Sequence, residues 1–359
     1  MQTQSHTIAA ALGSILLATA AQALHAQVEF HSKALAITVT GRVHSQFATT
    51  SVDGERSSQF LIRRARLTAE VEVNEFISGK IQPDYGEGEV NLKDAYVRLE
   101  FSPTFRVTAG QFKRPFDLFE LTSSTQILVI ERAGGIDGLN SCSGPGGLCS
   151  LSRFTEKLQY SDRDIGVKVD GKTSSGKFSY AASITNGTGA NAADTNGTKS
   201  YTGRVGFSPK KGVSFGANVG VHDYVRPGTT DNDYGTAVGG DIEIGSFDSG
   251  LHIRGGVVGG DNWKKLIGTD PSTFVSTQGI VSYKAGITGS PYVTAVEPVA
   301  RFSYGDPDTD APDDDGWLFT PGFVLHFTGR NKIAANIDIW SPSAGSTELS
   351  VKVQSYLHF

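Results

Sequence analysis

Basic side chains at alternate positions along several short segments are the residues of this chain best suited to act on a solute. Around a water-filled passage, Lys and Arg side chains lower the barrier for an anion that leaves bulk water. Acidic residues such as Glu70, Asp84 and Asp94 fall at the same positions, so paired charges that stiffen a wall are the alternative interpretation. The basic candidates are Arg42, Arg64, Arg66, Lys80, Arg98, Arg106, Lys113 and Arg114. The predicted solute-binding residues are Arg64, Arg66, Lys113 and Arg114 as the selective cluster, with Arg98 and Arg106 beside them.

The two cysteines, Cys142 and Cys149, are separated by six residues in the Gly- and Pro-rich stretch SCSGPGGLCS. Such a stretch can bend back on itself, and an oxidising compartment favours disulfides. A metal site would need further ligands, and no histidine or second cysteine pair lies nearby. We therefore predict a Cys142–Cys149 disulfide and no metal site or cofactor.

Aspartates crowd the stretch from Asp306 to Asp315. Spaced aspartates can bind calcium, but the twelve-residue spacing that ends in glutamate is missing. A solvated outer loop is the simpler interpretation, because charge runs usually face water. Divalent ions that bridge this loop to lipopolysaccharide phosphates remain an open alternative.

The bulk composition points away from several classes of protein. A length of 359 residues suggests two or three soluble domains, yet no shift in composition marks a boundary. Basic and acidic residues number 32 and 37, which argues against nucleic acid as a partner because such binding needs a basic face. Hydrophobic residues make up 38% of the chain, a low fraction for a core of this size.

The N-terminus has the features of an export signal. Residues 8–27 form an apolar run rich in small side chains, and it ends in a small-residue cleavage pattern at Ala26. The run is too short to span a bilayer comfortably as a helix. We predict a signal peptide over 1–26 and a mature chain over 27–359.

Period-two alternation of apolar and polar residues dominates the rest of the chain and predicts strands. Short and long polar links largely alternate between these segments, and the long links are predicted at 187–200, 225–232, 260–271 and 305–314. Short turns on one side and long loops on the other are typical of an outer-membrane β-barrel, whose strands expose one face to lipid and one to a wet lumen. The predicted strands are 37–47, 59–73, 76–86, 90–101, 104–112, 163–171, 176–186, 201–208, 212–224, 233–245, 249–259, 272–285, 292–304, 315–328, 331–341 and 346–359. The fold class is therefore all-β: a transmembrane antiparallel barrel of about sixteen strands.

The last predicted strand adds a local signal. Leu349, Val351 and Val353 share one side with the terminal Phe359. An aromatic residue that ends an alternating strand is similar to the C-terminal strand that outer-membrane barrels present to their assembly machinery. The expected location is the outer membrane of a Gram-negative-type bacterium, in contact with lipid bilayer and lipopolysaccharide.

About fifty residues, 113–162, separate the fifth and sixth predicted strands. A link of that length inside a compact domain tends to be functional, and hydrocarbon cannot satisfy its irregular backbone. Its apolar side chains could pack on an inner wall while its charges face water. We predict a constriction loop that enters the barrel; a loop folded over the mouth is the alternative.

Three motifs resemble the phosphate-selective porin O and P family: RRARL at 63–67, LKDAYV at 92–97, and GQFKRPFDLFELTSS with ERA within 110–133. The strand pattern extends the resemblance over about 37–359. The resemblance implies a sixteen-stranded barrel, usually a homotrimer, that passes small anions through a basic constriction.

The predicted function is a porin for passive diffusion of small anions, with phosphate or polyphosphate as candidates. No nucleophile elbow, phosphate loop or paired-histidine motif appears, so no enzymatic activity is predicted. A barrel enzyme and an adhesion or structural barrel are the alternatives. An enzyme would need a Ser/His or Asp/His set on one wall.

Overall fold

The computed structural model describes residues 28–32, 35–132 and 149–359. The export signal predicted over 1–26 lies outside the described residues. Among the residues described, no helix is long and apolar enough to cross a membrane.

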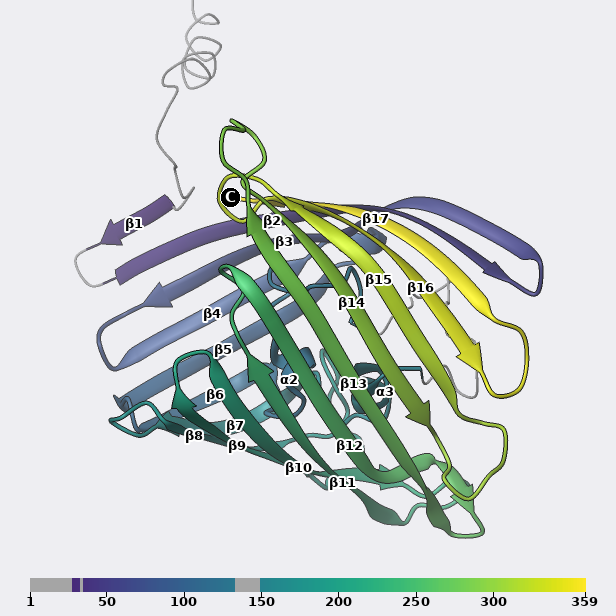
Figure 1. The fold of residues 1–359 in the computed structure, drawn as a ribbon. Helices are drawn as coiled ribbons and strands as arrows, with labels where there is room; N and C mark the ends of the chain where they lie inside the picture. Colours follow the sequence, from purple (N-terminus) through teal and green to yellow (C-terminus); the bar gives the residue numbers. More distant parts are fainter. Residues whose placement is uncertain (1–27, 33–34, 133–148) are drawn as a thin grey trace, which may run out of the picture.

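Sixteen antiparallel strands of the described chain, β2 to β17, form a closed ring. Each strand pairs with the next along the chain, and β17 returns to pair with β2 (Figure 1). The short strand β1 pairs with β2 outside this order. The predicted transmembrane barrel is therefore confirmed. The strands are β1 (Val28–Ser32), β2 (Leu35–Val52), β3 (Glu55–Glu72), β4 (Ile77–Asp84), β5 (Asn91–Ser102), β6 (Phe105–Lys113), β7 (Arg163–Lys172), β8 (Phe178–Thr185), β9 (Ser200–Lys210), β10 (Val213–Val225), β11 (Asn232–Ile244), β12 (Gly250–Ile267), β13 (Asp270–Gly286), β14 (Ala295–Asp306), β15 (Gly316–His326), β16 (Lys332–Pro342) and β17 (Glu348–His358).

Each of the sixteen predicted segments overlaps one strand of the ring, and one predicted loop was wrong. Residues 260–271 were expected to be a long polar link. Instead, β12 and β13 continue through most of this stretch and meet at a tight turn with Gly268 in the left-handed region, at φ 67°. The alternation of apolar and polar residues is lost in this stretch, because the hairpin extends beyond the apolar part of the wall. Sequence pattern alone therefore did not predict these strands.

Alternating burial shows how each strand divides its side chains between two environments. In β17, Leu349, Val351 and Val353 are exposed on the outside, whereas Ser350 and Lys352 are buried on the inside. This is the arrangement expected when the outer face meets lipid and the inner face meets the lumen. The period-two pattern therefore determines which residues line the channel.

The C-terminal Phe359 contributes to the closure of the barrel, where β17 pairs with β2. Its backbone N–H donates to the Gly41 carbonyl at 3.0 Å, and the Gly41 N–H donates back to Phe359 at 2.7 Å. A Cβ at position 41 would lie 2.2 Å from the Phe359 ring, so only glycine leaves room for that ring. The terminal aromatic residue thus has a structural role in closure.

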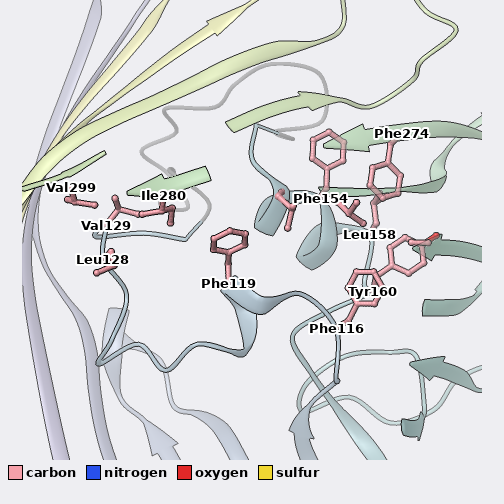
Figure 2. Packing of buried hydrophobic residues seen from close by; sticks show 13 residues of the cluster. Phe116, Phe119, Leu128, Val129, Phe154, Leu158, Tyr160, Phe274, Ile280 and Val299 are labelled. Carbon is pink, nitrogen blue, oxygen red and sulfur yellow. The ribbon is translucent and has the colours of Figure 1, made fainter. Parts of the chain in front are cut away.

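Two short helices lie inside the ring, in the segment between β6 and β7 (Figure 1). They are α2 (Leu118–Leu121) and α3 (Leu151–Lys157); a single 3₁₀ turn, η1 (Gly86–Gly88), follows β4. Figure 2 shows the apolar cluster that joins the segment to the wall. Phe119 and Phe154 from the segment pack with Phe274 and Ile280 of β13 and with Val299 of β14.

Candidate functional site

The segment 114–132 and 149–162, called the inner loop below, is held together by side-chain caps. Asp117 accepts from the Phe119 N–H at 2.9 Å and so caps α2. Its second carboxylate oxygen accepts from the Thr155 hydroxyl at 2.9 Å, which ties α2 to α3. Burial, together with the Glu120 carboxylate, raises the pKa of Asp117 to about 6. The cap therefore joins two helices that are each too short to be stable alone.

Cations on the wall hold the inner loop by its backbone. Arg301 of β14 donates from Nη1 to the carbonyls of Glu131 at 2.8 Å and Arg132 at 2.7 Å. Lys332 of β16 donates to the Ile127 carbonyl at 2.9 Å. These bonds satisfy an irregular backbone that would otherwise lie unpaired inside the barrel. The loop consequently follows the inner wall from β10 round to β17.

Carboxylates of the loop are paired just as tightly. Glu131 accepts from Arg63 Nε at 2.8 Å and lies 3.4 Å from Arg64 Nη2. Burial alone would raise the pKa of Glu131, but the two guanidinium groups outweigh it and lower the pKa to about 2. Burial opposes ionisation of Glu120 as well, and Arg132 and Lys113 lower its pKa to about 2.

On β2 to β7, beside the inner loop, four cations come together; Arg42, Arg66, Lys93 and Arg163 are called the basic cluster below. Arg66 Nε donates to Asp84 at 2.6 Å, and Arg163 Nε donates to Asp94 at 2.7 Å. Arg163 Nη1 also lies 3.5 Å from a carboxylate oxygen of Asp162. The other two cations, Arg42 and Lys93, have no carboxylate within 4.0 Å in the described chain. Both nevertheless lie within electrostatic range of Arg163 and Asp84.

A serine of the inner loop meets the basic cluster. Arg42 Nη1 donates to Ser124 Oγ at 2.9 Å, and Arg66 Nη1 donates to the same atom at 3.4 Å. A hydroxyl has two acceptor lone pairs and one donor, so these bonds use its acceptors. Its own O–H remains to be donated.

The residues predicted from sequence take different places. Arg66 belongs to the basic cluster, but Arg64 and Arg114 are 3% and 2% exposed. Arg114 donates to the Ser161 carbonyl at 2.6 Å beneath the inner loop, and Lys113 is paired with Glu120 at 2.9 Å. Selectivity from these four residues stays a prediction.

The remaining predicted cations line the same side of the lumen. Arg98 donates to the Thr108 hydroxyl at 3.2 Å, and Arg106 is paired with Asp170. Lys80 lies 3.2 Å from Glu70. Arg106 and Lys80 are therefore in ion pairs, which is the alternative interpretation that the sequence had left open.

Sequence parity missed several residues of the site. Arg63 was not among the basic candidates, but a β-bulge leaves it without a partner in β2 and its side chain reaches Glu131. Lys93 lies next to a second register shift between β4 and β5. The adjacent arginines at 63 and 64 were a usable signal, because a strict alternation would place one of them in hydrocarbon.

A serine, a histidine and an aspartate, the kind of set that a barrel enzyme would need, do come together at one rim of the barrel. Ser200 Oγ lies 3.1 Å from His222 Nδ1 and donates to Asp223. All three side chains are buried, and Asp223 also accepts from Asn196 and Thr198 of the neighbouring loop. Asp223 therefore anchors the loop that contains Asn196 and Thr198, and the buried Ser200 presents no exposed hydroxyl.

Two aspartates of the acidic stretch are paired with a lysine of β12. Asp308 and Asp314 accept from Lys265 at 2.8 and 3.0 Å, and no set of three or more His, Cys, Asp or Glu able to hold a metal occurs within the described ranges.

Cys149 is buried against Leu318 and Trp340. Cys142 lies outside the described residues, so the disulfide stays a prediction.

Comparison with known proteins places the chain among porins. No curated protein matches it. The outer-membrane channel DcaP of Acinetobacter baumannii is similar at a TM-score of 0.65 and 14% identity, covering 92% of this chain and 99% of DcaP. OmpF of Salmonella typhi, solved with daunomycin, gives 0.59 and 11%, covering 92% and 100%. The trimer form of Vibrio cholerae OmpT, an outer-membrane protein, gives 0.55 and 12%, covering 90% and 100%.

These likenesses show the fold, while the family follows from the sequence itself. The family described as phosphate-selective porin O and P matches residues 37–245, which is more than half of the chain. The match includes β2 to β11 and the whole inner loop. The protein therefore belongs to the phosphate-selective porin O and P family and is a porin of the Gram-negative outer membrane.

Proposed function

We propose that this porin passes small anions by passive diffusion, with phosphate or polyphosphate as candidate solutes. The observation that carries the proposal is the charge of the basic cluster. Its four cations lie against three carboxylates, those of Asp84, Asp94 and Asp162. In the described chain neither Arg42 nor Lys93 has an acidic partner, so one positive charge is left in excess. An excess of positive charge at a narrow point favours anions over cations.

The inner loop supports this proposal by its position. Its apolar side chains pack on the wall from β10 to β17, and its Ser124 contacts Arg42 and Arg66 of the basic cluster. We therefore place the passage for solutes beside the basic cluster. Solutes would pass close to Arg42, which the buried Ser124 holds in place by accepting its hydrogen bond. Guanidinium groups match phosphate oxygens well because several N–H donors lie in one plane.

We further propose a homotrimer that the barrel assembly machinery inserts by way of the C-terminal strand. The likeness to a trimeric structure supports the first part. The pairing of Phe359 with Gly41 supports the second, since the terminal strand forms the closing seam.

Single-channel recording in planar bilayers tests the function. The purified porin should form open channels whose reversal potential in a KCl gradient shows anion preference, and phosphate should reduce the chloride current. Absence of conductance would contradict the channel itself. A cation-selective channel would contradict the anion proposal and leave the porin assignment intact. A hydrolase screen on the same sample addresses the alternative of a barrel enzyme.

A further inference from the structure

Behind the inner loop, the seam formed by β17, β2 and β3 buries a contiguous patch of polar side chains, called the seam patch. His44 stands opposite Arg64 on β3 and opposite Tyr356 on β17, and Gln46 stands opposite Gln354. Directly opposite residues on one face have their Cβ atoms about 5 Å apart. None of the five is more than 3% exposed.

Several polar atoms of the seam patch have no hydrogen-bond partner within the described chain. They are Nε and Nη1 of Arg64, Nε2 of His44, the whole amide of Gln46, Oε1 of Gln354 and the hydroxyl of Tyr356. Arg64 has one weak contact, from Nη2 to Glu131 at 3.4 Å. Buried polar groups in folded proteins are almost always paired. We therefore expect a bound partner, water or a ligand, at these atoms.

The seam patch is also short of negative charge. Among the described residues, Glu131 is the one carboxylate paired with Arg64, and Arg63 holds it more closely, at 2.8 Å. Arg132 adds a further cation within electrostatic range of Arg64. A buried cation without full compensation is strongly unfavourable. Water could supply the missing hydrogen bonds, but it could not neutralise the positive charge of Arg64.

Donors outnumber acceptors at the patch as well. The Nδ1 atom of His44 faces the Gln354 amide nitrogen at 3.5 Å, which makes Nδ1 the acceptor and leaves the proton on Nε2. His44 Nε2, Arg64 and the Gln46 amide N–H are then all buried donors without a partner in the described chain. Such a donor set suits an anion and disfavours a metal cation.

We propose that the seam patch binds a small inorganic anion of halide size, chloride in most media. The anion completes the neutralisation of Arg64 and helps to anchor the loop arm 127–132 against the seam. The near-complete burial of the patch argues for a halide over a larger oxyanion. The site lies behind the inner loop and is independent of the solute that the channel passes.

Crystals of the full-length mature porin grown in sodium bromide test the site directly. An anomalous peak is expected within hydrogen-bonding distance of Arg64 and Gln46. Arg64→Gln should abolish this peak, whereas Arg66→Gln, which alters the channel side, should leave it. A well-ordered seam without anomalous signal would mean that water fills the patch and would overturn the proposal.

A solution measurement guards against an adventitious ion and against a variant that fails to fold. The melting temperature of the parent in detergent should rise with bromide relative to gluconate at matched ionic strength, because a ligand of the native state stabilises it. Gln46→Leu, which removes one donor without removing charge, should reduce the rise. A crystal peak without any halide-dependent shift would indicate an adventitious ion only and would also overturn the proposal.

Discussion

Removing the two unpaired cations of the basic cluster should abolish much of the anion preference. The cluster has four cations against the carboxylates of Asp84, Asp94 and Asp162, so its net charge is +1. The double substitution Arg42→Gln and Lys93→Gln brings that charge to −1. Neither residue is in an ion pair in the described chain, so neither change leaves a carboxylate without its partner.

The magnitude follows from the distance between these charges and a passing ion. At about 7 Å, a unit charge is worth roughly 0.6 kcal/mol in a water-like dielectric and roughly 1.2 kcal/mol at an effective dielectric of about 40. Salt at about 0.1 M, with a Debye length of about 10 Å, halves these values. Two lost charges act oppositely on anion and cation, so the permeability ratio should fall by between about sevenfold and about fiftyfold.

The reversal potential in a KCl gradient measures this ratio. A matched control is Arg56→Gln with Lys172→Gln, which removes the same charge from exposed positions. The control should keep the parent's reversal potential. If the cluster variant kept it too, with conductance intact, the basic cluster would not set selectivity. If the control shifted as far as the cluster variant, overall charge would be the cause.

Further predictions concern the inner loop. Glu131 has its pKa lowered from 4.5 to about 2, so its stabilisation is complete above about pH 4.5 and is lost as the pH falls through about 2. Asp117 has its pKa raised from 3.8 to about 6, so its contribution is complete below about 3.8 and is lost as the pH rises through about 6. In melting curves from acid to mildly basic pH, Glu131→Gln should flatten the acid limb and Asp117→Asn the upper limb; profiles identical to the parent would contradict these assignments. Finally, Cys142 and Cys149 should resist alkylation until reduced, and intact mass should reveal one disulfide; free labelling of both without reductant would refute the bridge.

The sequence was sufficient for the barrel because strand geometry is local. Successive side chains point to opposite faces whatever lies beyond the strand, so period-two patterning alone gives sixteen strands and the lumen-facing position of Arg66. The prediction weakened where polar residues continued a hairpin past the apolar wall, as at 260–271. It also weakened at the bulge, where one extra residue in β3 brings Arg63 to Glu131.

Which cation meets which partner was decided by the tertiary structure. Arg42 and Ser124 are 82 residues apart, and Arg301 is 170 residues from the Glu131 carbonyl that it holds. No local pattern encodes such pairs, because they depend on how the inner loop follows the closed wall. For the same reason, sequence could indicate that Arg64 faces inward but not that it lies behind the loop: facing the lumen is a property of the strand, whereas exposure to the channel depends on what packs against it.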